Sequence, residues 1–182
     1  RTKGIEIVIV PSDDTGEINC AALARMITPE TKAIFLTHAP SHSGLVNPAE
    51  AVGKIARDNG IIYVLDACQS VGQMPVDVKS IGCDIVCGTG RKFLRGPRGT
   101  GFLYVSRRIL SDLNPPFVDL HAANWTSTHE YSFREDAKKF ESYERFMAGQ
   151  IALGEAAQYA LNIGLTNIEI RNAYLSTLLR EQ

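Results

Sequence analysis

The sequence has almost no net charge and no long hydrophobic run. Its 19 Lys and Arg residues against 20 Asp and Glu residues give a formal net charge of −1. This balance argues against a dedicated nucleic-acid or membrane-surface protein, because such proteins depend on a large cationic excess. No apolar run approaches the roughly 20 residues that a membrane span needs. We therefore expect neither a nucleic acid nor a membrane among its partners.

Cysteine is also scarce and unpaired in pattern. The four cysteines include no CxxC pair and no Cys/His set at zinc spacing, so we predict no metal site and no disulfide framework. No secretory signal pattern opens the sequence. Disulfides persist mainly in oxidising compartments, and we expect this protein to belong to the reducing cytoplasm.

Short apolar runs alternate with helical patterns over the first hundred residues. The runs at 5–10, 33–37, 61–65, 84–87 and 101–105 mostly lack polar alternation, which is typical of strands covered on both faces. Helical patterns lie at 20–27 and 47–60; Asn47, Pro48 and Glu50 predict a capped start for the second. This alternation indicates an α/β fold with a mainly parallel, three-layer sheet.

The pattern changes after about residue 106. Residues 115–133 have few periodic signals and predict a long loop. A long helix is predicted from roughly 140 to 162, and Thr166 with Glu169 suggests a capping box for one more helix. That last pattern has no stop signal and the first residue is Arg, so we expect the chain to be part of a longer protein.

Polar residues follow three of the predicted strands. Thr37 and His38 follow the second run, Asp66 and Gln69 the third, and 88–92 (GTGRK) the fourth. Ligands of parallel α/β sheets bind beyond the carboxyl ends of the strands. The sequence therefore predicts a polar pocket at one edge of the sheet.

The segment CGTGRKFLRGPRGTGF (87–102) has five glycines and four cationic side chains in sixteen positions. It is compatible with a solvated loop, with a nucleic-acid patch, or with a phosphate site that uses Lys92 as a nucleophile. The nucleotide motifs GxxxxGK[ST] and GxGxxG both fail, because Phe93 stands where each requires another residue. A nucleic-acid module also lacks interleaved aromatics and a companion basic surface.

The wider segment LDACQSVGQMPVDVKSIGCDIVCGTGRKFLRGPRGTGFLYV (65–105) resembles the cofactor-binding segment of class V aminotransferases. The shared pattern is Asp-x-x-Gln, about twenty residues, Ser/Thr-Gly-His/Arg-Lys, and a Gly-Pro turn. Upstream, THAPSHSGLVNP (37–48) resembles the family's His-containing loop. The family includes cysteine desulfurases, selenocysteine lyases and isopenicillin-N-epimerase-like enzymes. The resemblance implies the aspartate-aminotransferase-like large domain of fold type I, with pyridoxal 5′-phosphate as cofactor.

The resemblance also implies a role for each matched residue. Lys92 would form a Schiff base with the cofactor and later act as general base, since an amine is nucleophilic when unprotonated. Asp66 would pair with the pyridinium nitrogen and keep the ring an electron acceptor. The remaining contacts would be Gln69 to the ring oxygen, His38 against the ring face, and Thr89 and Arg91 to the phosphate.

Three further residues depart from the pattern or stand outside it. Ser41 lies where relatives often carry Asn near the ring oxygen, so we give it a weaker contact. The resemblance would place Thr126, in the predicted loop, at a partner subunit's phosphate. Cys68 lies inside the motif, but the family's sulfur-accepting cysteine lies far downstream, so we interpret Cys68 as a packing residue.

These expectations define an organisation and a function. Residues 1–135 would form part of the cofactor-binding large domain, and 136–182 the long helix and the start of a connection to a smaller domain. The function implied is transamination or C–S bond cleavage of an amino acid by a homodimer. The alternative is a non-catalytic protein that keeps the scaffold; the joint presence of Asp66, Gln69 and Lys92 argues against it.

Overall fold

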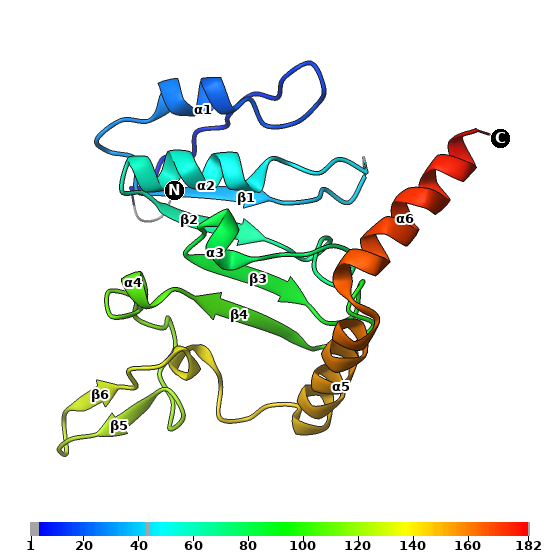
Figure 1. Cartoon of the computed structure of the whole chain (residues 1–182). Helices are drawn as coiled ribbons and strands as arrows, with labels where there is room; N and C mark the ends of the chain where they lie inside the picture. The colour runs from blue at the N-terminus through cyan, green and yellow to red at the C-terminus, as the bar shows by residue number, and fades with distance from the viewer. Residues whose placement is uncertain (1–3, 43, 182) are drawn as a thin grey trace.

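The computed structural model describes residues 4–42 and 44–181 and contains a central four-stranded sheet (Figure 1). Ser43, in the predicted His-containing loop, lies outside the described residues. The strands follow chain order across the sheet: β1 (Ala33–Thr37), β2 (Ile62–Asp66), β3 (Ile85–Thr89) and β4 (Gly101–Val105). The first three are parallel and β4 is antiparallel to β3. The mainly parallel α/β sheet is thereby confirmed.

Three helices cover one face of this sheet: α1 (Cys20–Met26), α2 (Ala49–Asp58) and α3 (Val78–Ile81). Tyr63 and Leu65 of β2 and Val52 of α2 have no exposed surface and form the centre of the core. The opposite face is more open, and Phe35 of β1 is 75% exposed there. Alternate strand residues therefore differ in burial, and β2 and β3 both alternate between buried and half-buried positions.

The strand predicted at 5–10 is wrong. The structure has no strand over these residues, and Ile7 and Ile9 are 86% and 85% exposed. A strand needs a neighbour whose backbone groups complete the hydrogen-bonded ladder. Within the described residues the neighbouring segment pairs only through an isolated bridge between Ser12 and Ile18. The apolar composition of 5–10 predicted a strand, but composition alone cannot show whether a pairing partner is present.

The predicted cap of α2 is also corrected. Pro48 is the N-cap residue, and no side chain caps the helix. The Asn47 side chain instead donates from Nδ2 to the Thr37 carbonyl at 2.8 Å and accepts from the Ile18 amide at 2.9 Å. Glu50 accepts a hydrogen bond from the Ser80 hydroxyl. Both side chains therefore join separate segments, because tertiary partners compete with local capping.

The predicted loop at 115–133 contains regular structure. The antiparallel strands β5 (Ala123–Trp125) and β6 (Tyr131–Phe133) form a small hairpin away from the main sheet (Figure 1). Helix α4 (Arg107–Leu110) precedes it and the 3₁₀ helix η1 (Ala137–Phe140) follows. The strands have three residues each, too few to give a clear period in the sequence.

The long helix is confirmed in type but begins later than predicted. Helix α5 runs from Met147 to Ile163, and residues 141–146 are not helical. Asp119 accepts from the Tyr143 amide at 2.7 Å, and Arg145 donates to Glu141 at 2.9 Å. These bonds hold the segment outside the helix.

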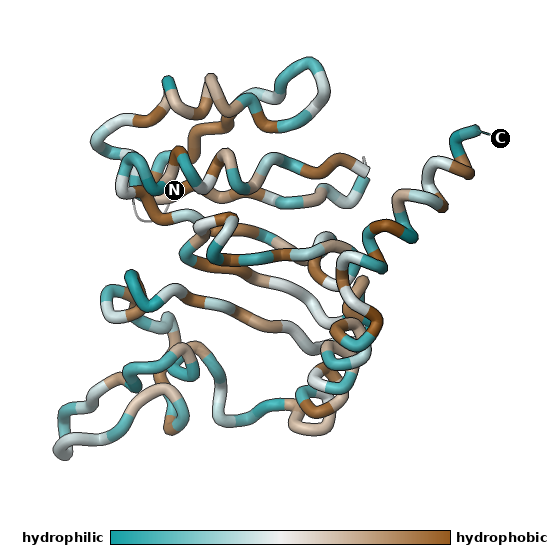
Figure 2. The backbone as a smooth tube through the Cα atoms, viewed as in Figure 1, coloured by the Kyte–Doolittle hydropathy of each residue, from teal (hydrophilic) through white to brown (hydrophobic). Residues whose placement is uncertain are grey.

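Helix α6 (Leu165–Arg180) follows directly, with Gly164 as its N-cap and no side-chain cap. The capping box at Thr166 and Glu169 is therefore wrong, because Gly164, at φ 88°, already separates the two helices and Thr166 lies inside α6. Helix α6 projects from the body and carries hydrophobic residues along its length (Figure 2). Over 4–42 and 44–181, none of the helices combines the length and apolar character that crossing a membrane requires.

Candidate active site

Asp66 ends β2 at the carboxyl edge of the sheet, between Thr37 of β1 and Cys87 of β3. Its backbone carbonyl accepts from the His38 amide at 2.9 Å, and its Oδ1 accepts from the Cys68 amide at 2.9 Å. The side chain is half-buried. The carboxylate is thus fixed by its own strand and by the turn that follows, as a group that must orient a ligand requires.

Gln69 and Ser41 meet at this edge. The Gln69 Nε2 donates to the Ser41 hydroxyl at 2.6 Å, across 28 residues of sequence. Gln69 lies in the turn after β2, and Ser41 lies in the loop after β1. Sequence reasoning assigned both to one atom of the same ligand, and the structure brings them together.

The residues after β3 form a tight loop. Thr89 ends the strand; Arg91 is exposed and Lys92 is half-buried. The loop closes through the Gly90 amide to the Thr100 carbonyl at 2.9 Å and the Gly96 amide to the Gly90 carbonyl at 2.7 Å. The strand order β1-β2-β3 therefore places Lys92 at the same edge as Asp66, because parallel strands end on the same side.

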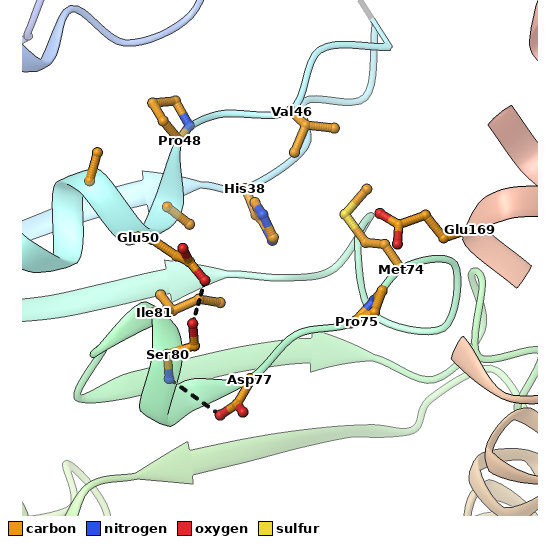
Figure 3. Close-up of a pocket in the computed structure, with 12 residues that line it drawn as sticks. His38, Val46, Pro48, Glu50, Met74, Pro75, Asp77, Ser80, Ile81 and Glu169 are labelled. Atoms are coloured by element: carbon orange, nitrogen blue, oxygen red, sulfur yellow. Dashed lines mark hydrogen bonds between the residues drawn. The ribbon is translucent and has the colours of Figure 1, made fainter. Parts of the chain in front are cut away.

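His38 lies in a different setting. Its ring is buried and its Nδ1 lies 3.0 Å from the Ser70 hydroxyl. The ring points into a cavity of about 790 Å³ that the start of α2 and the segment before α3 also line (Figure 3). Burial lowers the pKa of His38, which keeps the ring neutral near neutral pH. The contact of His38 with the cofactor ring stays a prediction, and the structure records a hydrogen-bonded core histidine.

The thiol and the backbone amide of Cys68 both interact with the Asp66 carboxylate. Burial, followed by a hydrogen bond to Asp66, raises the pKa of the Cys68 thiol to about 11. A thiol with such a pKa is almost entirely protonated at neutral pH and is a poor nucleophile. This agrees with our interpretation of Cys68 as a packing residue.

Thr126 lies apart from the other predicted site residues. It belongs to the β5–β6 hairpin, where its amide donates to the Glu130 carbonyl at 3.0 Å. Figure 1 shows this hairpin at the opposite end of the chain's main sheet from the loops after β1, β2 and β3. Within this chain Thr126 is not part of the site, and its role toward a partner subunit stays a prediction.

The sequence reasoning missed Gly72. This glycine has φ 91°, and a Cβ on it would lie 2.5 Å from the backbone carbon of Phe93. The turn that carries Gln69 therefore packs directly against the loop that carries Lys92. A glycine three residues after Gln69 was the signal in the sequence, but its meaning depends on a contact that only the fold shows.

Comparisons with known proteins agree with this arrangement. The family model for class-V aminotransferases matches residues 1–182. A probable cysteine desulfurase of Methanothermobacter thermautotrophicus is 32% identical over 169 residues, which are 93% of this chain and 42% of that protein. The apo structure of a cysteine desulfurase from Thermococcus onnurineus NA1 superposes with a TM-score of 0.90 at 30% identity, over 98% of this chain and 44% of that one. C-DES, solved with glycine covalently linked to its PLP cofactor, gives a TM-score of 0.72 at 26% identity, over 80% of this chain and 39% of that one. The chain thus spans less than half the length of these relatives.

Proposed function

Because the chain belongs to the class-V aminotransferase family, we propose that it forms the lysine-bearing part of a pyridoxal-phosphate enzyme that cleaves a C–S bond in an amino acid. The family uses this cofactor. The observation that carries the proposal is the meeting of Asp66, the Gln69–Ser41 pair and the Lys92 loop at one edge of the sheet. Cysteine desulfurases among the relatives favour a sulfur-containing amino acid such as cysteine over other substrates.

The residues at this edge fit the cofactor by their chemistry. A carboxylate (Asp66) suits a protonated ring nitrogen, and a linked amide and hydroxyl (Gln69, Ser41) suit a phenolic oxygen. Thr89 and Arg91 supply a hydroxyl and a guanidinium for a phosphate. Lys92 supplies the amine that an aldehyde requires.

When bound, pyridoxal phosphate supplies an electron sink for negative charge at the substrate α-carbon. The protein's part is to hold and move protons. The Asp66 carboxylate would stabilise the positive charge of the protonated ring nitrogen. The Lys92 Nζ would act as the base that takes a proton from the α-carbon. Cys68 is assigned no step, because burial and its hydrogen bond to Asp66 raise the pKa of the thiol to about 11 and make it a poor nucleophile.

The experiment that tests the proposal is an absorbance spectrum of the full-length natural protein with pyridoxal phosphate, before and after borohydride. We expect a visible band that borohydride bleaches as it fixes the cofactor to Lys92. Lys92→Ala should lose both the band and the label. Lys79→Ala, a change in an exposed lysine on α3, should keep them. A folded protein without the band would contradict the proposal and favour a non-catalytic scaffold.

Substrate and assembly are tested separately. With cysteine and excess dithiothreitol, which accepts the sulfur as a persulfide and releases it as sulfide, we expect equal amounts of alanine and sulfide. Pyruvate, ammonia and sulfide would instead indicate β-elimination, and mercaptopyruvate, in which the C–S bond is intact, would indicate transamination. We also propose a homodimer in the cytoplasm, where the four free cysteines stay reduced. Sedimentation of the full-length protein tests the dimer, and a monomer at micromolar concentration would contradict it.

A further inference from the structure

Helix α5 packs onto the loop that carries Lys92. A Cβ placed on either Gly90 or Gly96 would lie 2.9 Å from Cδ1 of Leu153, so the leucine side chain lies against both glycines. Leu153 is half-buried there. Figure 1 shows α5 beside the adjoining ends of β3 and β4. A side chain on either glycine would force the end of the leucine side chain to move, so this close approach depends on both glycines.

The loop's own hydrogen bonds are short-range. Besides the two bonds that close the loop at Gly90, the Arg95 amide donates to the Lys92 carbonyl at 2.9 Å. Glycine-rich segments with few buried contacts open easily. The position of Lys92 therefore depends on packing from outside the loop, and Gly72 and Leu153 provide two such contacts.

A second contact from α5 reaches the same loop. Arg95 has a left-handed backbone, with φ 62°, the sole non-glycine residue with positive φ in the described ranges 4–42 and 44–181. Its guanidinium lies 5.4 Å from the centroid of the Tyr159 ring, also on α5. An arginine above an aromatic face is attracted to it. The helix thus holds the loop at two places, at its glycines and at its strained residue.

We propose that Leu153 is a positioning residue for Lys92. By filling the space beside Gly90 and Gly96, its side chain fixes the loop so that the lysine stays at the edge that Asp66 and Gln69 share. The role of the lysine rests on the proposed function, whereas the order of the loop can be measured without any cofactor. Leu153 touches no reacting atom and acts only through the backbone of the loop.

The test begins with hydrogen–deuterium exchange on the cofactor-free, full-length protein. In Leu153→Ala we expect the Arg95 and Gly96 amides to exchange about tenfold faster, because local opening becomes easier. Amides of β2 should be unchanged. The matched control is Leu161→Ala on the same helix, where the side chain is 62% exposed; it should leave the loop unchanged. If the loop amides of Leu153→Ala exchange as in the wild type, the proposal is overturned.

A second readout uses the bound cofactor. We expect Leu153→Ala to shift the midpoint of the pH titration of the visible band, and Leu153→Met, which refills the space, to restore it. A uniform loss of thermal stability with an unchanged midpoint would show a merely structural role and overturn the proposal. If the wild type binds no cofactor but the loop amides respond, the proposed function fails and the ordering of the loop by Leu153 stands. Should Leu153→Ala not fold, Leu153→Val removes one methylene and keeps both readouts.

Discussion

The two halves of the chain bury apolar surface very differently. The core cluster draws all its buried members from the segment between Leu23 and Val86, with α1, α2 and α3 packed on the sheet. In α6 no residue is buried, and Ile170 and Leu179 are 63% and 75% exposed. The first half contains this core cluster, whereas α5 and α6 in the second half leave most of their apolar side chains exposed. The candidate site includes residues from both halves, because Asp66 lies at the end of β2 in the core and the Lys92 loop packs against α5.

The largest expected difference comes from the same change made in one helix of each half. In α2, a Cβ on Gly53 would lie 1.8 Å from the carbonyl oxygen of Ile81. In α5, a Cβ on Gly154 would meet nothing within 4 Å. We expect Gly53→Ala to lower the free energy of unfolding by about 3 kcal/mol, because overpacking forces α2 away from α3. Gly154→Ala should instead raise it by about 0.5–1 kcal/mol through helix propensity.

Urea unfolding of the two variants beside the wild type measures this difference. The comparison between the halves would break if Gly53→Ala were as stable as Gly154→Ala. It would also break if Gly154→Ala were strongly destabilising, since that result would mean that α5 is packed on a face that the structure shows open.

A smaller difference is expected from carboxylates. Asp84 is buried; it accepts from the Tyr63 amide at 3.0 Å and from Nε and Nη2 of Arg108 at 2.9 and 2.6 Å. Its own amide and carbonyl bond Tyr63 and Ser106, so this residue links the two central strands with β4. We expect Asp84→Ala to cost about 2 kcal/mol, because a buried amide and a guanidinium lose a charged partner.

The control lies in the second half. Glu141 accepts from Arg145 at 2.9 Å on the surface, and Glu141→Ala should change the free energy of unfolding by no more than about 0.5 kcal/mol. Thermal unfolding of both variants at low and high salt separates the cases, since screening weakens the surface pair far more. If Asp84→Ala and Glu141→Ala lowered the free energy of unfolding equally, the contrast between the two halves would be wrong.

The same contrast explains what the sequence could predict. The strands at 33–37, 61–65, 84–87 and 101–105 come from short segments rich in apolar and β-branched residues, and the local pattern suffices to predict them. Because parallel strands end together, the meeting of Asp66, Gln69 and the Lys92 loop followed from strand order. The run at 5–10 has the same pattern, but a strand also needs a neighbour, and pairing is a property of distant segments.

The sequence also could not predict which partners the side chains of three residues would contact. The sequence favours Asn47 as a cap, yet its amide joins β1 to the segment at Ile18. It offers no sign that Leu153 would reach Gly90, because 63 residues separate them. His38 and Thr37 are adjacent, and only the packed structure shows that the His38 ring turns toward Ser70.

The smallest expected effect is a loss of stability at low pH that comes from protonation of His38. Burial lowers the pKa of His38 in the folded protein, while the unfolded chain keeps the ordinary value near 6.5. Below about pH 6.5 the unfolded chain therefore binds the proton more readily than the folded one, and stability is lost as the pH falls toward the lowered folded value. His38→Gln, which can still bond Ser70, should flatten this loss between pH 7 and 5.5. His129→Gln changes an exposed imidazole between β5 and β6 and leaves the buried His38 in place, so it should keep the wild-type slope. Urea unfolding midpoints of both variants, measured across that pH range, test this prediction. If the midpoints of the two variants depend on pH in the same way, burial does not lower the pKa of His38 in the folded protein.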